Sequence, residues 1–340
     1  MGMDKKIVLI TGANSGVGFA TARKLAELGA EVVMVCRNPA RGNPARKEVA
    51  KVATGPAPTL LLADLSSQDS IHELAGEVRA RFSRIDVLLN NAGAIFARRQ
   101  VTADSIEKTF AINHLAPFLL TNLLLDLVQA APAGRVLTVA SESHSGALEF
   151  DNLQGERHYN FFGAYNRSKL GNILFTYELA RRLKGTGVTV NCLSPGPTIT
   201  SFGDNLRGLP ALFPMLMKRI PFLFRSPEKG AETSVYLASS PEVAGVSGRF
   251  FLRCHESRTK KITYDAEVAA RLWRASEDLC AKFTRNSRAV RPQGQVVAHK
   301  LVEQMLGHAP QVSRPPLLHR GSRSLTRQKG ISGRRRLERI

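Results

Sequence analysis

Short apolar runs alternate with amphipathic stretches from Lys6 to about Lys282, and this alternation restricts the possible folds more than any other feature. Each apolar run is hydrophobic along nearly its whole length, as expected of a strand that is covered on both faces. The predicted strands are Ile7–Ile10, Glu31–Cys36, Thr59–Leu62, Ile85–Asn90, Arg135–Ala140 and Val188–Leu193. The predicted helices are Gly16–Leu28, Pro39–Lys51, Gln68–Arg81, Asp104–Gln129 and Gly163–Leu183. This rhythm predicts an α/β fold, a doubly wound parallel sheet in a single domain.

The composition changes after about residue 284. Residues 285–340 hold thirteen Lys and Arg against two Glu, so this last sixth carries over half of the net charge of +20. Apart from a short apolar stretch at 296–306, it shows no periodicity, which is typical of disorder. We therefore expect a catalytic domain over residues 1–284 and a basic, disordered tail over 285–340. The tail lacks interleaved aromatic residues, so nucleic acid is not an expected partner.

The cysteines and the start of the chain indicate the compartment. Cys36, Cys192, Cys254 and Cys280 have a spacing that fits neither a metal site nor a disulfide framework, so we expect reduced thiols and no metal. No run reaches the ~18 apolar residues of a membrane span. The first residues also lack the apolar stretch of a signal peptide. These observations predict a cytoplasmic protein.

A glycine-rich turn joins the first predicted strand to the first predicted helix. Its sequence is Thr11-Gly12-Ala13-Asn14-Ser15-Gly16-Val17-Gly18. Glycines permit the tight turn and the close approach of a pyrophosphate, and the helix offers free N–H groups and the positive end of its dipole. The turn and its position predict a Rossmann fold that binds a dinucleotide.

Residues at the ends of the next strands indicate which dinucleotide is bound. Folds that use NAD usually place an acidic residue after the second strand, whereas Arg37 stands there and Arg41 follows one helical turn later. An arginine suits the 2′-phosphate of NADP, so we expect NADP(H) rather than NAD(H). After the third strand, Asp64 and Leu65 are placed to hold the adenine. The predicted pyrophosphate crevice is completed after the fourth strand by Asn91, Ala92 and Gly93.

Four side chains form the predicted catalytic group. Tyr165 and Lys169 are separated by one helical turn and share a face. A phenol has a pKa near ~10, and a neighbouring ammonium or an oxidised nicotinamide favours the phenolate. Ser141 ends the fifth predicted strand, where its hydroxyl can stabilise charge on a substrate oxygen. Asn113 interrupts a helix, either to hold a relay water or as a satisfied core amide.

The chain after the sixth predicted strand closes the site. The main chain of Pro195, Gly196, Thr198 and Thr200 is expected against the nicotinamide carboxamide. The segment Thr200–Arg225 is strongly apolar, which predicts a lid for a hydrophobic aldehyde, ketone or alcohol. Packing in a dimer or core and weak contact with a membrane surface are the alternatives for this segment. His144 and His158 are expected to line the pocket without catalysing.

Together these motifs resemble the short-chain dehydrogenase/reductase (SDR) family, classical type, over about residues 5–282. Within it, Cys36-Arg37-Asn38, Asn113-His114-Leu115 and the spacing from Ser141 to Tyr165 resemble retinol dehydrogenase-type NADPH-dependent reductases. The resemblance implies an oxidoreductase that transfers a hydride between NADP(H) and a hydrophobic carbonyl or alcohol by a Tyr-Lys-Ser-Asn mechanism. It also implies a homodimer or homotetramer. The alternative is a non-catalytic dinucleotide-sensing or scaffold protein on the same fold.

Overall fold

The computed structural model describes residues 2–144, 146–198 and 225–289, with side chains up to residue 281. The predictions for Thr200, for the apolar segment up to residue 224 and for the chain from residue 290 onward fall outside these residues. The described chain belongs to one compact unit, Met1–Ala289.

Among the described residues, eight strands form one sheet in the order β3-β2-β1-β4-β5-β6-β7-β8. The strands are β1 (Ile7–Thr11), β2 (Glu31–Cys36), β3 (Thr59–Leu62), β4 (Val87–Asn90), β5 (Arg135–Val139), β6 (Thr189–Ser194), β7 (Arg249–Leu252) and β8 (His255–Glu256). All neighbours pair in parallel except β7 with β8. The predicted doubly wound parallel sheet is confirmed.

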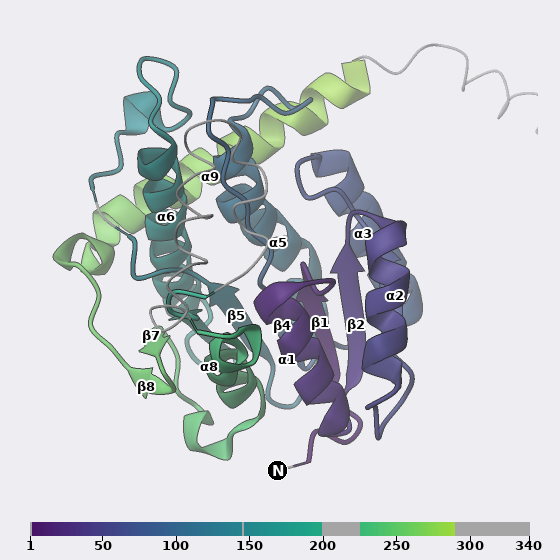
Figure 1. The fold of residues 1–340 in the computed structure, drawn as a ribbon. Coiled ribbons are helices and arrows are strands. Elements are labelled where there is room, and N and C mark those ends of the chain that lie inside the picture. The colour runs from purple at the N-terminus through teal and green to yellow at the C-terminus, as the bar shows by residue number, and fades with distance from the viewer. Residues whose placement is uncertain (1, 145, 199–224, 290–340) are drawn as a thin grey trace, which may run out of the picture. The chain divides into compact units, whose positions relative to one another are not determined.

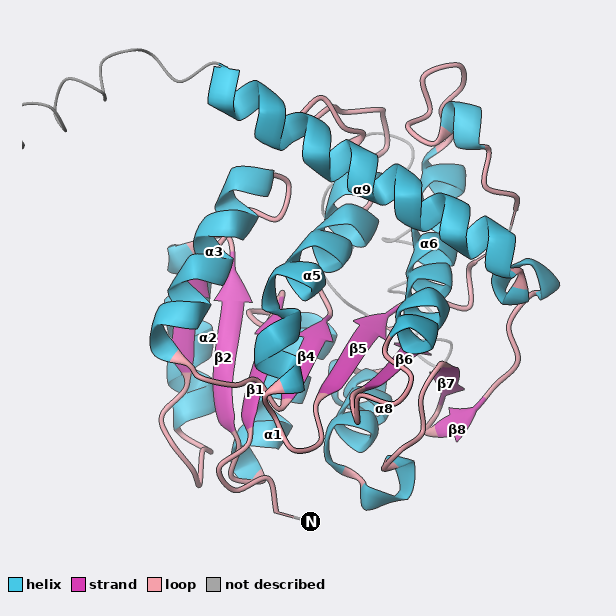
Figure 2. Cartoon of the chain, turned by 180° about the vertical axis from the view of Figure 1, so that it is seen from behind, coloured by secondary structure: helices cyan, strands magenta, loops and turns pink. Residues whose placement is uncertain are grey.

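Helices cover both faces of the sheet. On one face lie α1 (Gly16–Glu27), α2 (Pro39–Ala50) and α8 (Pro227–Ser239), in front of the strands in Figure 1. On the other face lie α3 (Gln68–Arg81), α5 (Ala116–Gln129) and α6 (Phe161–Arg182), and α9 (Ala266–Ala289) crosses over α5 and α6 (Figure 2). The shorter pieces are α4 (Lys108–Phe110), the π-helix η1 (Ala111–Leu115) and the 3₁₀ turns η2 (Phe150–Asn152), η5 (Pro241–Val243) and η6 (Lys261–Tyr264).

The central strands are buried on both faces, which explains their apolar sequences. In β1, Val8 and Ile10 pack in the core beneath α1, α2 and α8. Ile7 and Leu9 pack in the core beneath α3, α5 and α6. Because successive side chains of a strand point to opposite faces, a strand between two helical layers needs apolar residues at every position.

The strand order places the functional site. β1 pairs with β2 on one side and with β4 on the other, so the chain winds outward in both directions from this point. In open α/β sheets, ligands bind outside the carboxyl ends of the strands where the order reverses. The turns after β1, β2, β4, β5 and β6 meet at this edge.

Several boundaries differ from the sequence prediction, most of them by one or two residues. The helix expected from Asp104 begins at Lys108, because the Glu107 carboxylate accepts hydrogen bonds from Thr109 N and Phe110 N and so caps it. The same helix changes to π-helical over η1 before it continues as α5. The fifth strand ends at Val139 rather than at Ala140, and α9 continues beyond the expected domain boundary at residue 284.

Among the residues that the structure describes, one helical stretch, Lys108–Gln129, is long and apolar enough to cross a membrane by length and composition, with a mean hydropathy of 1.4. However, 78% of its most apolar window is buried inside the fold. Burial of this kind is typical of a core helix, because a membrane-spanning helix presents its apolar side chains to lipid.

Candidate active site

A cavity of about 580 Å³ opens at the carboxyl edge of the sheet, between the turns after β1, β2, β3, β4, β5 and β6. It brings together most residues predicted for the site: Gly12, Asn14, Ser15, Gly16, Val17, Gly18, Arg37, Asp64, Leu65, Asn91, Ala92, Gly93, Ser141, Tyr165, Lys169, Pro195, Gly196 and Thr198. Thr11 and Asn113 are not on its wall, and Thr200 lies outside the described residues. The predicted cofactor residues and the predicted catalytic residues therefore share one cavity.

The glycine-rich turn has the geometry that a pyrophosphate requires. Gly12 and Gly16 have φ values of +67° and +57°, which residues with a side chain rarely adopt. Ser15 is the N-cap residue of α1, but its side chain makes no capping hydrogen bond, so the helix N-terminus faces the cavity uncapped. A Cβ atom on Gly18 would lie 2.5 Å from Gly12 O. The turn can therefore approach a phosphate closely and donate N–H groups to it.

Thr11 holds the glycine-rich turn against the turn after β4. Its hydroxyl accepts hydrogen bonds from Asn91 N and Ala92 N, both at 3.0 Å, and the Asn91 amide donates to Thr11 O at 2.8 Å. Thr11 is only 3% exposed. The side chain predicted to bind the cofactor is thus placed to shape the turn from behind the cavity wall.

The far end of the cavity is lined by two exposed cations. Arg37 follows β2 and Arg41 lies in α2, and neither makes an ion pair with the described residues. Between them, the Asn38 side chain accepts from Ala40 N at 2.8 Å and caps α2. Asp64, on the same wall, has one carboxylate oxygen bonded to Ser66 N and Ser66 Oγ. Two cations without carboxylate partners suit a phosphate better than a ribose hydroxyl.

Tyr165, Lys169 and Ser141 converge at the other end of the cavity. Lys169 is 3% exposed, and its Nζ donates to Val139 O at 2.7 Å and lies 5.7 Å from the centre of the Tyr165 ring. Tyr165 forms a side-chain hydrogen bond with Ser141. Ser141 Oγ also accepts from Ser143 N at 3.0 Å, which orients it just after β5. A carbonyl oxygen placed here would meet two hydroxyl groups.

Burial governs the protonation of this group. It raises the pKa of the Tyr165 phenol, and the hydrogen bond with Ser141 opposes that rise. Burial also lowers the pKa of the Lys169 ammonium from 10.5 to about 8. The sequence predicted that the ammonium and an oxidised nicotinamide would favour the phenolate, whereas burial favours the neutral phenol. A neutral phenol near pH 7 is a proton donor, which suits reduction of a carbonyl.

Asn113 is fully buried in the π-helix η1, and its side chain makes hydrogen bonds within the protein. Its Oδ1 accepts from Ala94 N at 2.7 Å, and its Nδ2 donates to Ala94 O and Ser168 Oγ, both at 3.0 Å. Both amide hydrogens are therefore used within the protein. This geometry fits the alternative interpretation, a satisfied core amide. It also ties the loop after β4 to α6 beside Tyr165.

Neither histidine predicted to line the pocket lies on the cavity wall. The His144 ring contacts Ser141 O through Nδ1 at 2.8 Å and Lys260 N through Nε2 at 3.3 Å. It is 6% exposed and supports Ser141 from behind. His158 Nε2 instead lies 3.2 Å from a carboxylate oxygen of Glu149. The prediction that both histidines line the pocket was therefore wrong. Their position between Ser141 and Tyr165 in the sequence does not place them on the cavity wall.

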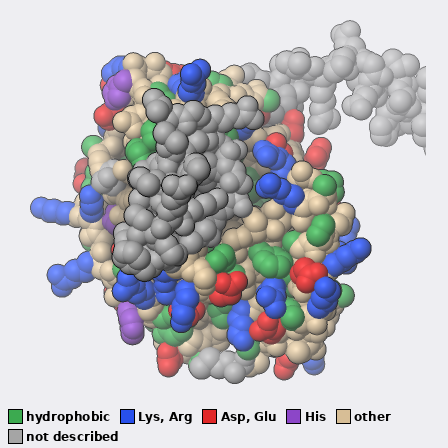
Figure 3. Space-filling model, viewed as in Figure 1, with side chains coloured by type: hydrophobic (Ala, Val, Ile, Leu, Met, Phe, Trp, Pro, Cys, Tyr) green, Lys and Arg blue, Asp and Glu red, His purple; other side chains and the backbone are tan. Residues whose placement is uncertain are grey.

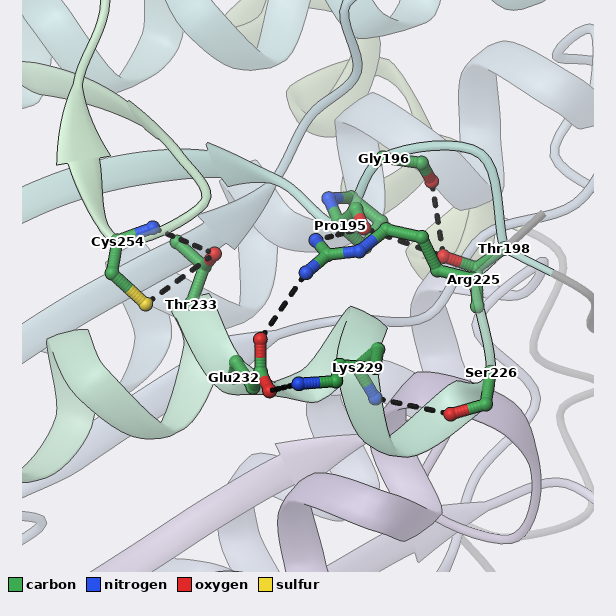
Figure 4. A network of polar contacts seen from close by, with 9 residues as sticks. All are labelled: Pro195, Gly196, Thr198, Arg225, Ser226, Lys229, Glu232, Thr233 and Cys254. Carbon is green, nitrogen blue, oxygen red and sulfur yellow. Dashed lines mark hydrogen bonds and ion pairs between the residues drawn. The ribbon is translucent and has the colours of Figure 1, made fainter. Parts of the chain in front are cut away.

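The loop after β6 is held by Arg225, for which the sequence predicted no such structural role. Figure 4 shows Arg225 extended across this loop, with its guanidinium between Pro195 and Glu232. Its Nη1 donates to Pro195 O at 3.3 Å, its Nη2 to Glu232 at 3.2 Å, and its main-chain N to Pro197 O at 2.7 Å. A bridge between Thr198 and Arg225 completes the attachment. The part of the cavity wall that this loop forms is therefore held in place by Arg225.

Sequence reasoning also missed the apolar wall beside the catalytic group. Ala94, Phe96 and Ile112 pack together, and all three line the cavity. The first two follow the Asn91-Ala92-Gly93 turn, and Ile112 precedes Asn113 in the π-helix. Their position in the sequence next to predicted site residues could have indicated that they line the cavity. An apolar wall at this place favours an apolar substrate.

Known proteins share both the sequence and the fold. Residues 6–208 match the short chain dehydrogenase family. The chain is 45% identical to retinol dehydrogenase 14 of Homo sapiens over 290 residues, 81% of this chain and 86% of that protein. A solved structure of an uncharacterised protein from Mycobacterium Paratuberculosis is 30% identical with a TM-score of 0.67, covering 82% of this chain and 95% of that one. Another, 3-ketoacyl-(acyl-carrier-protein) reductase from Brucella melitensis complexed with NADH, is 25% identical with a TM-score of 0.57, covering 74% and 97%.

The fold and the family match define an oxidoreductase with a Rossmann-type sheet. The chain belongs to the short-chain dehydrogenase family, and retinol dehydrogenases are among its relatives. The family predicted from the sequence motifs is therefore confirmed. The choice between NADP and NAD and the identity of the substrate are separate questions, because the relatives do not decide them.

Proposed function

We propose that this protein is an NADP(H)-dependent reductase of hydrophobic aldehydes and ketones. The observation that carries the proposal is one cavity with two different ends. Arg37 and Arg41, which make no ion pair with any residue that the structure describes, line one end, and the Tyr165–Ser141–Lys169 group lines the other. The cations suit the 2′-phosphate of NADP, and the hydroxyl pair suits a carbonyl oxygen.

Each residue of the catalytic group has a defined task in this proposal. NADPH, when bound, supplies the hydride that the carbonyl carbon receives. The Tyr165 phenol donates its proton to the substrate oxygen, so that the product is an alcohol. The Ser141 hydroxyl donates a hydrogen bond to the same oxygen while negative charge develops there. The Lys169 ammonium, below the phenol, stabilises the phenolate left behind.

The substrate class follows from the cavity wall and from the relatives. Ala94, Phe96 and Ile112 present apolar surface beside the catalytic group. A relative with 45% identity is named retinol dehydrogenase 14. We infer that the substrate is a long, apolar aldehyde or ketone of the retinoid type.

We also propose a cytoplasmic homodimer or homotetramer. Basic and acidic side chains are interspersed over the face shown in Figure 3, which gives no support to a nucleic-acid-binding patch there.

The proposal is tested by measuring NADPH consumption with aldehydes and ketones of graded chain length. Wild type should reduce the longer, apolar members, and Tyr165→Phe should lower kcat by at least ~100-fold, the usual contribution of a positioned acid. Tyr236→Phe, which removes a phenol outside the cavity, is the matched control. NADPH binding should survive in the Tyr165 variant. Binding of NADPH by wild type without turnover of any carbonyl would instead favour the dinucleotide-sensing protein.

A further inference from the structure

The loop that carries Phe96 of the apolar wall contains no helix or strand between Asn91 and Gln100. Main-chain groups in such a loop lack the partners that a helix or a sheet would supply, so hydrogen bonds from other segments must satisfy those that are buried. Phe96 is only 6% exposed, so its place depends on these bonds. The partners of the loop therefore indicate what holds the apolar wall beside the catalytic group.

The segment 149–160, which precedes α6, holds this loop at two points. Arg99 Nε donates to Gln154 O at 2.8 Å, and Tyr159 Oη donates to Phe96 O at 2.9 Å. The second bond is made to the main chain of the wall residue itself. Tyr159 does not line the cavity, whereas Phe96 does. The phenol therefore lies behind the wall and is bonded directly to the residue that forms it.

Tyr159 stands one residue before the N-cap residue of α6. The Asn160 side chain accepts from Phe162 N at 2.9 Å and from Gly163 N at 3.2 Å, so it fixes where the helix begins. The same helix carries the catalytic tyrosine and lysine. The hydrogen bond between Tyr159 and Phe96 therefore joins the start of the catalytic helix to the apolar wall.

The Tyr159 ring lies close to a glycine in a tight turn. Gly155 has a φ of +62°, and a Cβ atom there would lie 3.0 Å from Tyr159 Cδ2. Asn152, 2% exposed, holds the turn, because its main-chain O accepts from Gly155 N and its Oδ1 accepts from Arg157 N, both at 3.0 Å. Burial raises the pKa of the Tyr159 phenol, so the hydroxyl keeps its proton and remains a donor to the Phe96 carbonyl.

We propose that Tyr159 is a positioning residue that sets the substrate preference, because its hydrogen bond to Phe96 O holds the Phe96 ring on the cavity wall at a fixed place relative to the catalytic group. The assignment rests on the proposed function, since it refines which carbonyls the same site accepts. Tyr159 acts through Phe96 and lies outside the cavity. Loss of its hydroxyl should therefore impair the binding of long, apolar carbonyls and leave hydride and proton transfer intact.

The hydrogen bond is tested without any activity measurement. Labelling phenylalanine carbonyl carbons and alanine amide nitrogens with NMR-active isotopes gives paired signals only for Phe-Ala sequences, which occur at 19–20, 96–97 and 110–111. The Phe96 carbonyl signal, assigned with Phe96→Leu, should shift in Tyr159→Phe, and the signal of the pair at 19–20 should not. An unchanged Phe96 signal would overturn the proposal. The measurement needs neither NADPH nor substrate, so it separates a failure of the positioning role from a failure of the proposed reaction.

Kinetics with butanal and decanal test the effect on substrate preference. Tyr159→Phe removes one hydrogen bond, so KM for decanal should rise about two- to tenfold. The kcat values for both aldehydes should stay nearly unchanged, as should KM for butanal, which is too short to need the apolar wall. Tyr236→Phe removes a phenol in α8, on the opposite face of the sheet from α6, and should match wild type. An equal rise of KM for both aldehydes, or an unchanged KM for decanal, would contradict the proposal.

A double-mutant cycle shows whether Tyr159 acts through Phe96. In Phe96→Ala the ring that the hydrogen bond positions is absent. Adding Tyr159→Phe to that variant should therefore raise KM for decanal no further, because the two residues are coupled. If the two effects multiplied in the double variant, Tyr159 would influence the substrate independently of Phe96, and the proposed route through the wall would be wrong.

Discussion

Replacing Arg37 by Asp is expected to shift the cofactor preference from NADPH towards NADH. Arg37 stands at the cavity wall after β2, exposed and without a carboxylate partner among the described residues. A guanidinium can meet a phosphate with two parallel charge-assisted hydrogen bonds, whereas a carboxylate repels that phosphate and accepts from ribose hydroxyls. The substitution thus weakens the binding of the phosphate of NADPH and strengthens the binding of the ribose hydroxyls of NADH.

The magnitude follows from the exposure of the side chain. A hydrogen bond to a charged group contributes ~1.5–3 kcal/mol, and solvent screening puts an exposed arginine at the lower end of that range. At ~1.4 kcal/mol per decade, the ratio of kcat/KM for NADPH to that for NADH should fall at least about tenfold. Arg41, on the same wall, keeps part of the attraction, so Arg37→Asp with Arg41→Ala should fall further.

The assay is steady-state kinetics with both cofactors at a fixed carbonyl concentration. Lys47→Asp makes the same charge change in α2 at an exposed residue that does not line the cavity, and it should leave the ratio unchanged. A wild type that prefers NADH would refute the assignment of the cations to the 2′-phosphate. So would an Arg37 variant whose ratio matches that of the Lys47 control.

Three further perturbations test the rest of the site. Lys169→Met should change the pH dependence of stability. In the folded wild type the pKa of Lys169 is lowered from 10.5 to about 8, so burial of its ammonium destabilises the fold fully below about pH 8. This destabilisation disappears as the pH rises to 10.5, where the lysine is neutral in both the folded and the unfolded state. The melting temperature of wild type relative to the variant should therefore rise over that interval, and a constant difference would contradict it. Asn113→Ala should lower the free energy of unfolding by about 2 kcal/mol or more in chemical denaturation, because Ala94 N and O lose their partners in a buried place; a loss of activity without a loss of stability would instead support a direct role. Phe96→Ala should raise KM for long apolar carbonyls and leave that for short ones nearly unchanged, whereas an equal rise for both would place the apolar subsite elsewhere.

The sequence predicted the sheet and the position of the site because both depend on local patterns. A strand between two helical layers must be apolar throughout, and the runs around Ile10 and Leu89 show this directly. Polar residues after such runs, Arg37 and Ser141 among them, lie at the carboxyl edge by topology alone. Most polar residues and glycines of the cavity wall could therefore be named from the sequence, whereas the apolar wall of Ala94, Phe96 and Ile112 could not.

What the sequence did not reveal depends on contacts between distant segments. The direction in which His144 points follows from its contact with Lys260 N, 116 positions later. Arg225 gains its role from Pro195 and Glu232, which the fold brings to it. No periodicity or spacing encodes such pairs.

The strand order has a consequence for how this enzyme can change. The wall with Arg37 and Arg41 is built from β2 and α2, whereas Tyr165 and Lys169 come from α6, and no described hydrogen bond or ion pair joins the two groups. Substitutions at sites without shared partners usually have additive effects. Mutations that alter coenzyme choice and mutations around the catalytic group can therefore accumulate in either order during evolution. A variant with only one of the two changes would retain function without the other.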